Sequence, residues 1–282
     1  MFNLVMGRGS VVSEAMTGDP RITGISITGS VPVGRHLTGA CAANMKKLQM
    51  EMGGKNPMIV MDDADLETAV SACLNGAFFQ TGQRCTASSR LIVQSGIHDA
   101  FVAELNRQMQ ALKVGHALAD GMQIGPVASS SQLEGNYVLR GAGRRRRLRS
   151  AGRGHLIRET VGYFQVPALF IWANNAMRSA REEIFGPCAS VIRFDDFDEA
   201  VSLANDTPFG LSSGICTTNL RFARDFKRRS AAGMVILDLP TAGVDYHVPF
   251  GGRTGSSFGS REQDSYAAEF YTSVKTAYTF AG

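Results

Sequence analysis

The residue best suited to covalent chemistry is the cysteine that ends the polar turn Gly82-Gln83-Arg84-Cys85. A cysteine in such a turn is unlike a buried structural cysteine, and a nearby base or helix N-terminus would lower its pKa and raise its thiolate fraction. Most single cysteines are packing residues, so this turn alone does not decide the question. The five cysteines are scattered without a Cys-x-x-Cys pair, which argues against a disulfide framework and predicts no metal site.

A second residue that could take part in chemistry is the carboxylate Glu51, which precedes Met52-Gly53-Gly54-Lys55-Asn56-Pro57. Paired glycines and an Asn-Pro indicate a backbone that leaves a helix and approaches another group closely. A carboxylate at such a place could act as a general base. The alternative is a surface glutamate at a helix end, and composition alone favours that alternative.

The segments that must position these residues alternate between strand-like and helix-like patterns, which predicts an α/β fold. Residues 22–28 indicate a strand, and Gly29-Ser30 then opens a helix whose apolar residues are Val33, Leu37, Cys41 and Leu48. Further strands are predicted at residues 58–61, 90–94, 166–172, 189–194, 213–217 and 233–237. Further helices are predicted at residues 66–77, with Asp62-Asp63 as the cap, and at residues 98–112, 198–204 and 219–229.

The C-terminal segment follows a different pattern. Glu269 to Thr279 is rich in β-forming residues and ends without a following helix, which predicts an edge strand. Such a strand would be available to another subunit, so we predict a homo-oligomer as a hypothesis. An edge strand of the chain's own sheet is an equally weighted alternative.

The charge of the chain is concentrated in one segment. The 282 residues carry a net charge of +4, and the stretch from Tyr137 to Arg153 holds seven arginines and no acid, so without these arginines the net charge would be −3. A general affinity for anionic partners such as nucleic acid is therefore not predicted. The composition is that of a globular protein, without a membrane span or a signal peptide, which predicts a cytoplasmic protein without a membrane partner.

Five sequence motifs occur together in one order along the chain, and this order is more specific than any single motif. They are Ile27-Thr28-Gly29-Ser30 with Gly34, the segment from Glu51 to Pro57, Phe79-x-x-Gly82-Gln83-x-Cys85, Glu182-Glu183-Ile184-Phe185-Gly186-Pro187, and Pro249-Phe250-Gly251-Gly252. In these motifs the chain resembles the NAD(P)-dependent aldehyde dehydrogenase superfamily over nearly its whole length. The resemblance implies an α/β fold with a catalytic domain and an incomplete Rossmann-like cofactor-binding domain.

The resemblance also implies a division of the chain. Residues 1–53 would be the remnant of the dinucleotide-binding domain, and residues 54–252 the catalytic thiol domain, with residues 137–153 as an anomalous arginine-rich segment. Residues 253–282 would be a C-terminal return segment with the oligomerisation strand.

The site residues follow from the same resemblance. Cys85 would be the nucleophile that attacks an aldehyde, and Glu51 the base that activates water to hydrolyse the resulting thioester. Gly29, Ser30 and Gly34 would bind the pyrophosphate of NAD or NADP at a helix start, where free N–H groups and the helix dipole favour an anion. Glu183 would accept hydrogen bonds from the nicotinamide ribose, and Phe185 would pack near the nicotinamide.

The resemblance is strongest toward 2-oxoglutarate semialdehyde dehydrogenases, in residues 239–252 and 269–278. Relatives have a long N-terminal part before the Gly29 motif, whereas 28 residues precede it here. We therefore predict an N-terminally truncated chain that lacks the side-chain donor of the oxyanion hole and has impaired activity on its own. The alternative is an inactive fragment that only associates with other subunits.

Two rival functions fit the residues less well. A cysteine hydrolase would need a histidine paired with Cys85, and none of the five histidines has a recognisable catalytic setting. A nucleic-acid-binding protein built on the arginine-rich segment would need interleaved aromatic residues or a known module, and neither is present.

Overall fold

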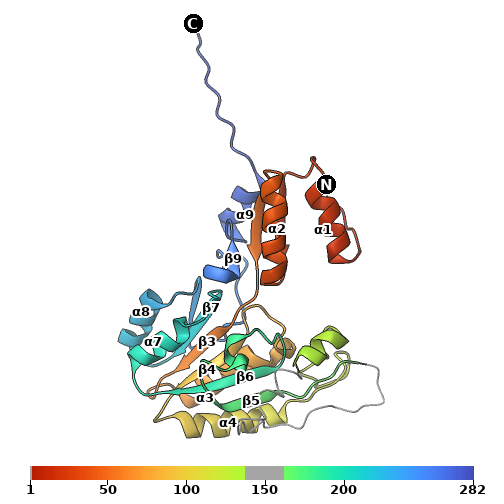
Figure 1. Cartoon of the computed structure of the whole chain (residues 1–282). Helices are drawn as coiled ribbons and strands as arrows, with labels where there is room; N and C mark the ends of the chain where they lie inside the picture. Colours follow the sequence, from red (N-terminus) through yellow and green to blue (C-terminus); the bar gives the residue numbers. More distant parts are fainter. Residues whose placement is uncertain (1, 137–161) are drawn as a thin grey trace.

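The computed structural model describes residues 2–136 and 162–282. Within these ranges helices and strands alternate around two sheets, so the predicted α/β fold is confirmed (Figure 1). The arginine-rich segment 137–153 lies outside the described residues.

The larger sheet has six parallel strands in the order β5-β6-β4-β3-β7-β8. These strands are rich in apolar residues, as expected for a parallel sheet that is covered on both faces. Their bounds are β3 Asn56–Val60, β4 Ser88–Gln94, β5 Ala168–Ala173, β6 Cys188–Phe194, β7 Ser212–Cys216 and β8 Met234–Leu237.

Helices cover both faces of this sheet. Successive side chains of a strand point to opposite faces, so Met58 and Val60 pack with α3 and α4, whereas Ile59 packs with α7 and α8. The two resulting apolar clusters are the core of the larger part of the molecule. The helices are α3 Leu66–Phe78, α4 His98–Ala111, α7 Phe197–Asn205 and α8 Leu220–Arg229, with the short α6 Arg178–Arg181 before β6.

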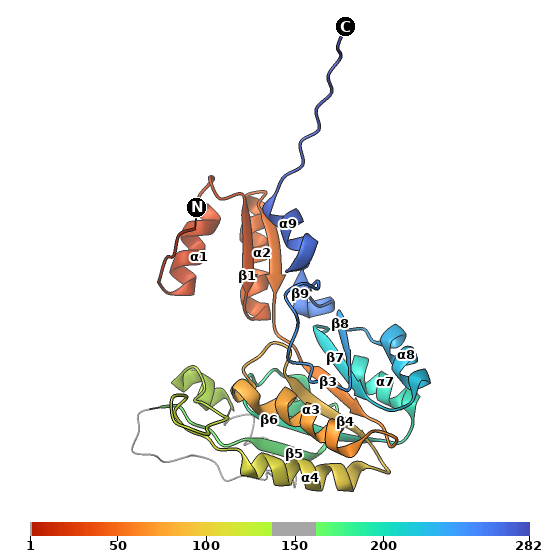
Figure 2. The same cartoon turned by 180° about the vertical axis from the view of Figure 1, so that it is seen from behind.

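A smaller sheet stands beside the larger one (Figures 1 and 2). Its strand β1 (Gly24–Thr28) pairs in parallel with β2 (Lys47–Glu51), and β2 pairs in the antiparallel direction with β9 (Ser257–Phe258). The helices of this part are α1 Gly9–Gly18, α2 Val31–Ala43 and α9 Asp264–Tyr271. Since β9 completes the sheet of β1 and β2, the chain returns to this part near residue 257; the domain boundaries at 53 and 252 stay a prediction.

The helices and strands near the start of the chain differ from those predicted. The helix expected to continue to Leu48 ends at Ala43, because Asn44 and Met45 form a turn in which Met45 has a φ of 52°. Leu48 and Glu51 therefore lie in strand β2. The helix α1 was not predicted.

The expected helix cap at Asp62-Asp63 was also wrong. The chain makes one more turn, and Asp65 accepts the capping hydrogen bond from the Thr68 backbone at 2.8 Å. The Asp62 carboxylate accepts a hydrogen bond from the Ile97 backbone instead, and Asp63 accepts one from the Thr217 hydroxyl.

The strand predicted over Glu269 to Thr279 is corrected as well. Residues up to Tyr271 belong to α9, and residues 272–282 have no helix or strand and run away from both sheets (Figure 2). A strand needs a hydrogen-bonding neighbour, and within the described chain this segment pairs with no strand. Its β-forming residues alone do not make it a strand of the chain's own sheet.

Candidate active site

A cavity of about 440 Å3 is bordered by both parts of the molecule. From the smaller part come the end of β1 and the start of α2, and from the larger part come the Cys85 turn and the loop before β6. This cavity brings together five of the predicted residues: Gly29, Ser30, Cys85, Glu183 and Phe185. The other residues that line it are Thr28, Met52, Gly53, Gln132 and Ile184.

The turn that carries Cys85 has an unusual backbone. In the short 3-10 helix η1 (Phe79–Gly82), Gln80, Thr81 and Gly82 have φ values of 52°, 60° and 62°, in the left-handed region. A Cβ on Gly82 would meet the Gly186 carbonyl oxygen at 2.2 Å, so only glycine fits. Strained backbone of this kind is frequent at functional sites, and here it packs the Cys85 turn against the Glu183 loop.

Two polar side chains whose roles were not predicted from the sequence hold this turn in place. The buried Asn56 amide donates to the carbonyl oxygens of Cys85 and Ala87 at 2.8 and 3.0 Å, and its own oxygen accepts from the Ser212 backbone. The Arg84 guanidinium donates to the Ala242 carbonyl at 3.2 Å and to the Asn75 carbonyl. Cys85 is therefore presented by a rigid loop.

The thiol itself is not activated in the way the sequence suggested. The pKa of Cys85 is raised, first by burial and then by the negative charge of Glu51, with a smaller contribution from Glu183. The N–H groups of Thr86 and Cys85 itself act in the opposite direction. The expected lowering of this pKa was wrong, and a base must take the thiol proton when the thiolate is needed.

Glu51 lies at the end of β2 and is 2% exposed, so neither the helix end nor the surface position considered from the sequence is correct. Its Oε2 accepts a 2.6 Å hydrogen bond from the Ser257 hydroxyl, and its Oε1 has no partner among the described residues. Burial is the main cause that raises the pKa of Glu51 to about 7, and Glu262 adds to it. A carboxylate with this pKa can both accept and release a proton near neutral pH.

This pKa predicts a pH-dependent stability. The folded pKa of Glu51 lies above its unfolded value of 4.5, so Glu51 contributes stability below pH 4.5 that is lost as pH rises through about 7. The free energy of unfolding of Glu51→Gln, relative to wild type, should therefore increase by about 3 kcal/mol between pH 4.5 and pH 8. Urea unfolding of both proteins across this range measures the effect, and a constant difference would contradict it.

The start of α2 lies at the cavity wall, where the Gly29 N–H donates to the Glu51 carbonyl at 3.0 Å and Pro32 has no N–H. Ser30 is the N-cap but makes no side-chain cap bond, and Gly34 donates back to the Ser30 carbonyl at 3.0 Å. Gly34 lies one turn further, where an added Cβ would meet the Met52 sulfur at 2.4 Å. The helix start is thus packed closely on Met52. The dipole of a helix and the first-turn N–H groups that lack an intrahelical partner favour a phosphate anion at such a start.

Glu183 and Phe185 border the same cavity from the loop after α6. The two oxygens of Glu183 lie over the backbone of Gly53 and Gly54: a Cβ on Gly53 would meet Oε2 at 2.0 Å, and the Gly54 N–H donates to Oε1 at 3.0 Å. Burial is the main cause that raises the pKa of Glu183. Phe185 is 38% exposed and has a φ of 52°, which turns this loop sharply.

Gln132 is a cavity residue that the sequence analysis missed. It lies in the helical residues 130–136, and its side-chain amide donates to the Ile184 carbonyl at 2.8 Å. It therefore fixes the loop that carries Glu183 and Phe185. A glutamine that follows three serines gave no signal in the sequence.

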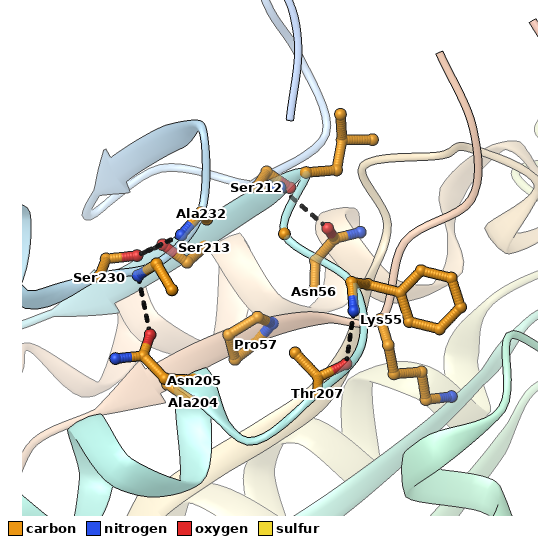
Figure 3. A pocket seen from close by; sticks show the side chains of 14 residues that line it. Lys55, Asn56, Pro57, Ala204, Asn205, Thr207, Ser212, Ser213, Ser230 and Ala232 are labelled. Atoms are coloured by element: carbon orange, nitrogen blue, oxygen red, sulfur yellow. Dashed lines mark hydrogen bonds between the residues drawn. The ribbon is translucent and has the colours of Figure 1, made fainter. Parts of the chain in front are cut away.

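A second hollow, of about 10 Å3, lies beside β3 and β7 and has room for about one water molecule (Figure 3). Asn56 and Ser212 meet there. Among residues 2–136 and 162–282 no group of three or more histidine, cysteine or acidic side chains could hold a metal ion, and no helix is long and apolar enough to cross a membrane.

Comparisons with known proteins agree on one family. Residues 1–277 match the aldehyde dehydrogenase family. The alpha-ketoglutaric semialdehyde dehydrogenase of Bacillus subtilis (strain 168) is 41% identical over 288 residues, which cover 99% of this chain and 58% of that protein. This chain therefore spans somewhat more than half the length of such a relative.

Solved structures give the same result. An NAD-dependent aldehyde dehydrogenase from Sinorhizobium meliloti has a TM-score of 0.91 and 34% identity, covering 95% of this chain and 53% of that one. A betaine aldehyde dehydrogenase from Staphylococcus aureus, solved in complex with NAD+, has a TM-score of 0.89 and 30% identity, covering 94% and 53%.

Proposed function

We propose, since the chain belongs to the aldehyde dehydrogenase family, that it oxidises an aldehyde to a carboxylic acid with NAD+ or NADP+. The observation that carries this proposal is the cavity that Cys85 lines together with Glu183 and the start of α2. The buried Glu51, whose charge acts on the Cys85 thiol, supplies a proton acceptor with a pKa of about 7.

The cysteine chemistry proceeds through a covalent intermediate on Cys85. Glu51 accepts the thiol proton, and the Cys85 sulfur forms a bond to the aldehyde carbon, so the carbonyl oxygen becomes an oxyanion. The N–H groups of Cys85 and Thr86 lie beside the sulfur and can donate to this oxyanion. Loss of hydride from the same carbon leaves a thioester on Cys85.

Hydrolysis of the thioester requires a base. Glu51 first releases the thiol proton to solvent and then, ionised again, takes a proton from a water molecule. The hydroxide adds to the thioester carbon, and the carbon–sulfur bond breaks with return of the electron pair to Cys85. The products are the carboxylic acid and the free thiolate. Oε1 of Glu51 is buried and has no hydrogen-bond partner among the described residues, so its lone pairs would accept the hydrogen bond from that water.

The cofactor would be held by the residues at the two ends of the cavity. The start of α2 at Gly29 and Ser30 suits a pyrophosphate, and the close contact of Gly34 with Met52 keeps this helix start in place. Glu183 suits the ribose hydroxyls at the nicotinamide end, beside Phe185. When bound, NAD+ or NADP+ supplies the hydride acceptor.

The substrate class that we propose is a semialdehyde with a carboxylate. The support is the 41% identity with the alpha-ketoglutaric semialdehyde dehydrogenase, together with the C-terminal motifs that the sequence shares with such enzymes. A homo-oligomer also belongs to the proposal, since residues 272–282 have no partner strand in the described chain and carry β-forming residues.

A second candidate function is a chain without activity of its own that only associates with other subunits. The chain aligns with 58% of the length of the Bacillus subtilis relative. In that case the chain alone would bind no cofactor and would oxidise no aldehyde.

One experiment separates the two. The purified, folded chain is mixed with NAD+ or NADP+ and a panel of aldehydes with and without a second carboxylate, and formation of the reduced cofactor is followed by absorbance. We expect reduction, fastest with the semialdehydes of dicarboxylic acids. A folded chain that reduces neither cofactor with any aldehyde would contradict the proposed activity and support the second candidate.

A further inference from the structure

Lys55 is a buried lysine to which neither the motifs nor the proposed chemistry assigns a role. It is 1% exposed, and its ammonium nitrogen Nζ has no hydrogen-bond partner among the described residues. A lysine in this state is costly, because burial disfavours the charged form. Burial, with a further contribution from Arg90, lowers the pKa of Lys55 to about 7.

The backbone of Lys55 is held in place on both sides. Its carbonyl oxygen accepts a 2.9 Å hydrogen bond from the buried guanidinium of Arg90, which also donates to the α7 carbonyls of Leu203 and Ala204. The preceding Gly54 donates its N–H to the Glu183 carboxylate. Lys55 is one of the residues that line the small hollow of Figure 3, and its side chain extends away from Asn56 there.

The charged groups around the Lys55 ammonium come from three elements. Arg90 of β4 disfavours the charge, whereas Cys188 at the start of β6 and the loop residues Glu183 and Glu182 favour it. Glu182 is already paired with Arg178 at the surface, through two hydrogen bonds. Glu183, which lies over Gly53 and Gly54, is therefore the carboxylate on which the Lys55 charge acts without a competing partner side chain.

We propose that Lys55 is a positioning residue that keeps the Glu183 carboxylate ionised beside the Gly53-Gly54 backbone, ready to accept hydrogen bonds from a ribose. Its role toward the cofactor rests on the proposed function. Burial favours the neutral form of Glu183, which would lose acceptor capacity, and the Lys55 charge opposes this. Lys55 is protonated below about pH 7, which is the range in which a carboxyl group titrates. Its positive charge is therefore present at the pH values at which Glu183 could become protonated.

The direct test is the titration of Glu183 by NMR in protein labelled with 13C at the glutamate carboxyl carbons. The Glu183→Gln variant identifies the signal. In Lys55→Met we expect the midpoint of Glu183 to rise by about one pH unit, a tenfold gain in proton affinity. Lys113→Met, the same change at an exposed lysine, should leave the midpoint where it is.

The reciprocal titration, in a Glu183 variant, tests the same coupling if Lys55→Met does not fold. Coupling between two sites is mutual, so Glu183→Gln should lower the midpoint of Lys55, followed in protein labelled with 13C at the lysine Cε. An unchanged midpoint of Glu183 in folded Lys55→Met would overturn the proposal. So would an unchanged midpoint of Lys55 in Glu183→Gln.

Cofactor affinity gives the functional readout. Titration with NAD+ at several pH values should show that binding weakens on acidification, and that Lys55→Met moves this loss to higher pH by the same amount as the Glu183 midpoint. A merely structural lysine would weaken binding equally at every pH. If wild type binds neither NAD+ nor NADP+, the proposed function fails, and the two NMR titrations still decide whether Lys55 controls Glu183.

Discussion

Replacing Cys85 by Ser should reduce aldehyde oxidation by on the order of a thousandfold or more, while the fold and the cofactor affinity stay unchanged. A serine hydroxyl is isosteric with the thiol, but it is far less acidic and a poorer nucleophile, so the bond to the aldehyde carbon no longer forms. The surrounding hydrogen bonds of Asn56 and Arg84 go to backbone groups and remain. The measurement is cofactor reduction at saturating aldehyde.

The matched control is Cys41→Ser in α2, a buried cysteine remote from the cavity lining. It should retain activity once it folds. Activity that survives in Cys85→Ser but falls in the control would place the nucleophile elsewhere.

Replacing Glu51 by Gln should reduce turnover by about a hundred- to ten-thousandfold. The amide cannot take a proton from water, so hydrolysis of the thioester stops even where some thiolate still forms. We expect a burst of reduced cofactor of at most one equivalent per chain, followed by almost no turnover. Rapid mixing of the variant with aldehyde and cofactor measures the burst.

The pH profile distinguishes this role from a structural one. In wild type, turnover should fall as the pH drops through about 7, because Glu51 becomes protonated. Ser257→Ala removes the hydrogen bond that favours the charged form of Glu51, so this fall should move to higher pH. A profile that is identical in wild type and Ser257→Ala would contradict the assignment of the base.

Much of the fold could be predicted from local patterns. The strands of the larger sheet are short apolar runs between helices of regular spacing, and each lies within a few residues of its predicted place. The strand β2 could not be recognised in the same way, because Leu48 continues the helical spacing of Leu37 and Cys41. Only the turn at Asn44 and Met45 separates the helix from the strand.

Some residues of the site could be predicted from the sequence and others could not, and the difference has a physical reason. Motif order indicated the cavity residues Cys85, Glu183 and Gly29, whose positions depend on local turns. Gln132 and Lys55 were assigned no role, because their surroundings depend on segments far away in the sequence. The pKa of Glu51 likewise depends first on burial and then on Ser257 and Glu262, more than 200 positions later, so its value could not be anticipated.

The central claim is that Cys85 carries the acyl group and Glu51 releases it. Glu51→Gln protein is incubated with aldehyde and cofactor, quenched in acid, digested and analysed by mass spectrometry. We expect a mass gain of the aldehyde less two hydrogens, which is one acyl group in place of the thiol hydrogen, on the peptide that contains Cys85 and on no other cysteine-containing peptide. Reduced cofactor formed without this adduct, or an adduct on a different residue, would contradict it.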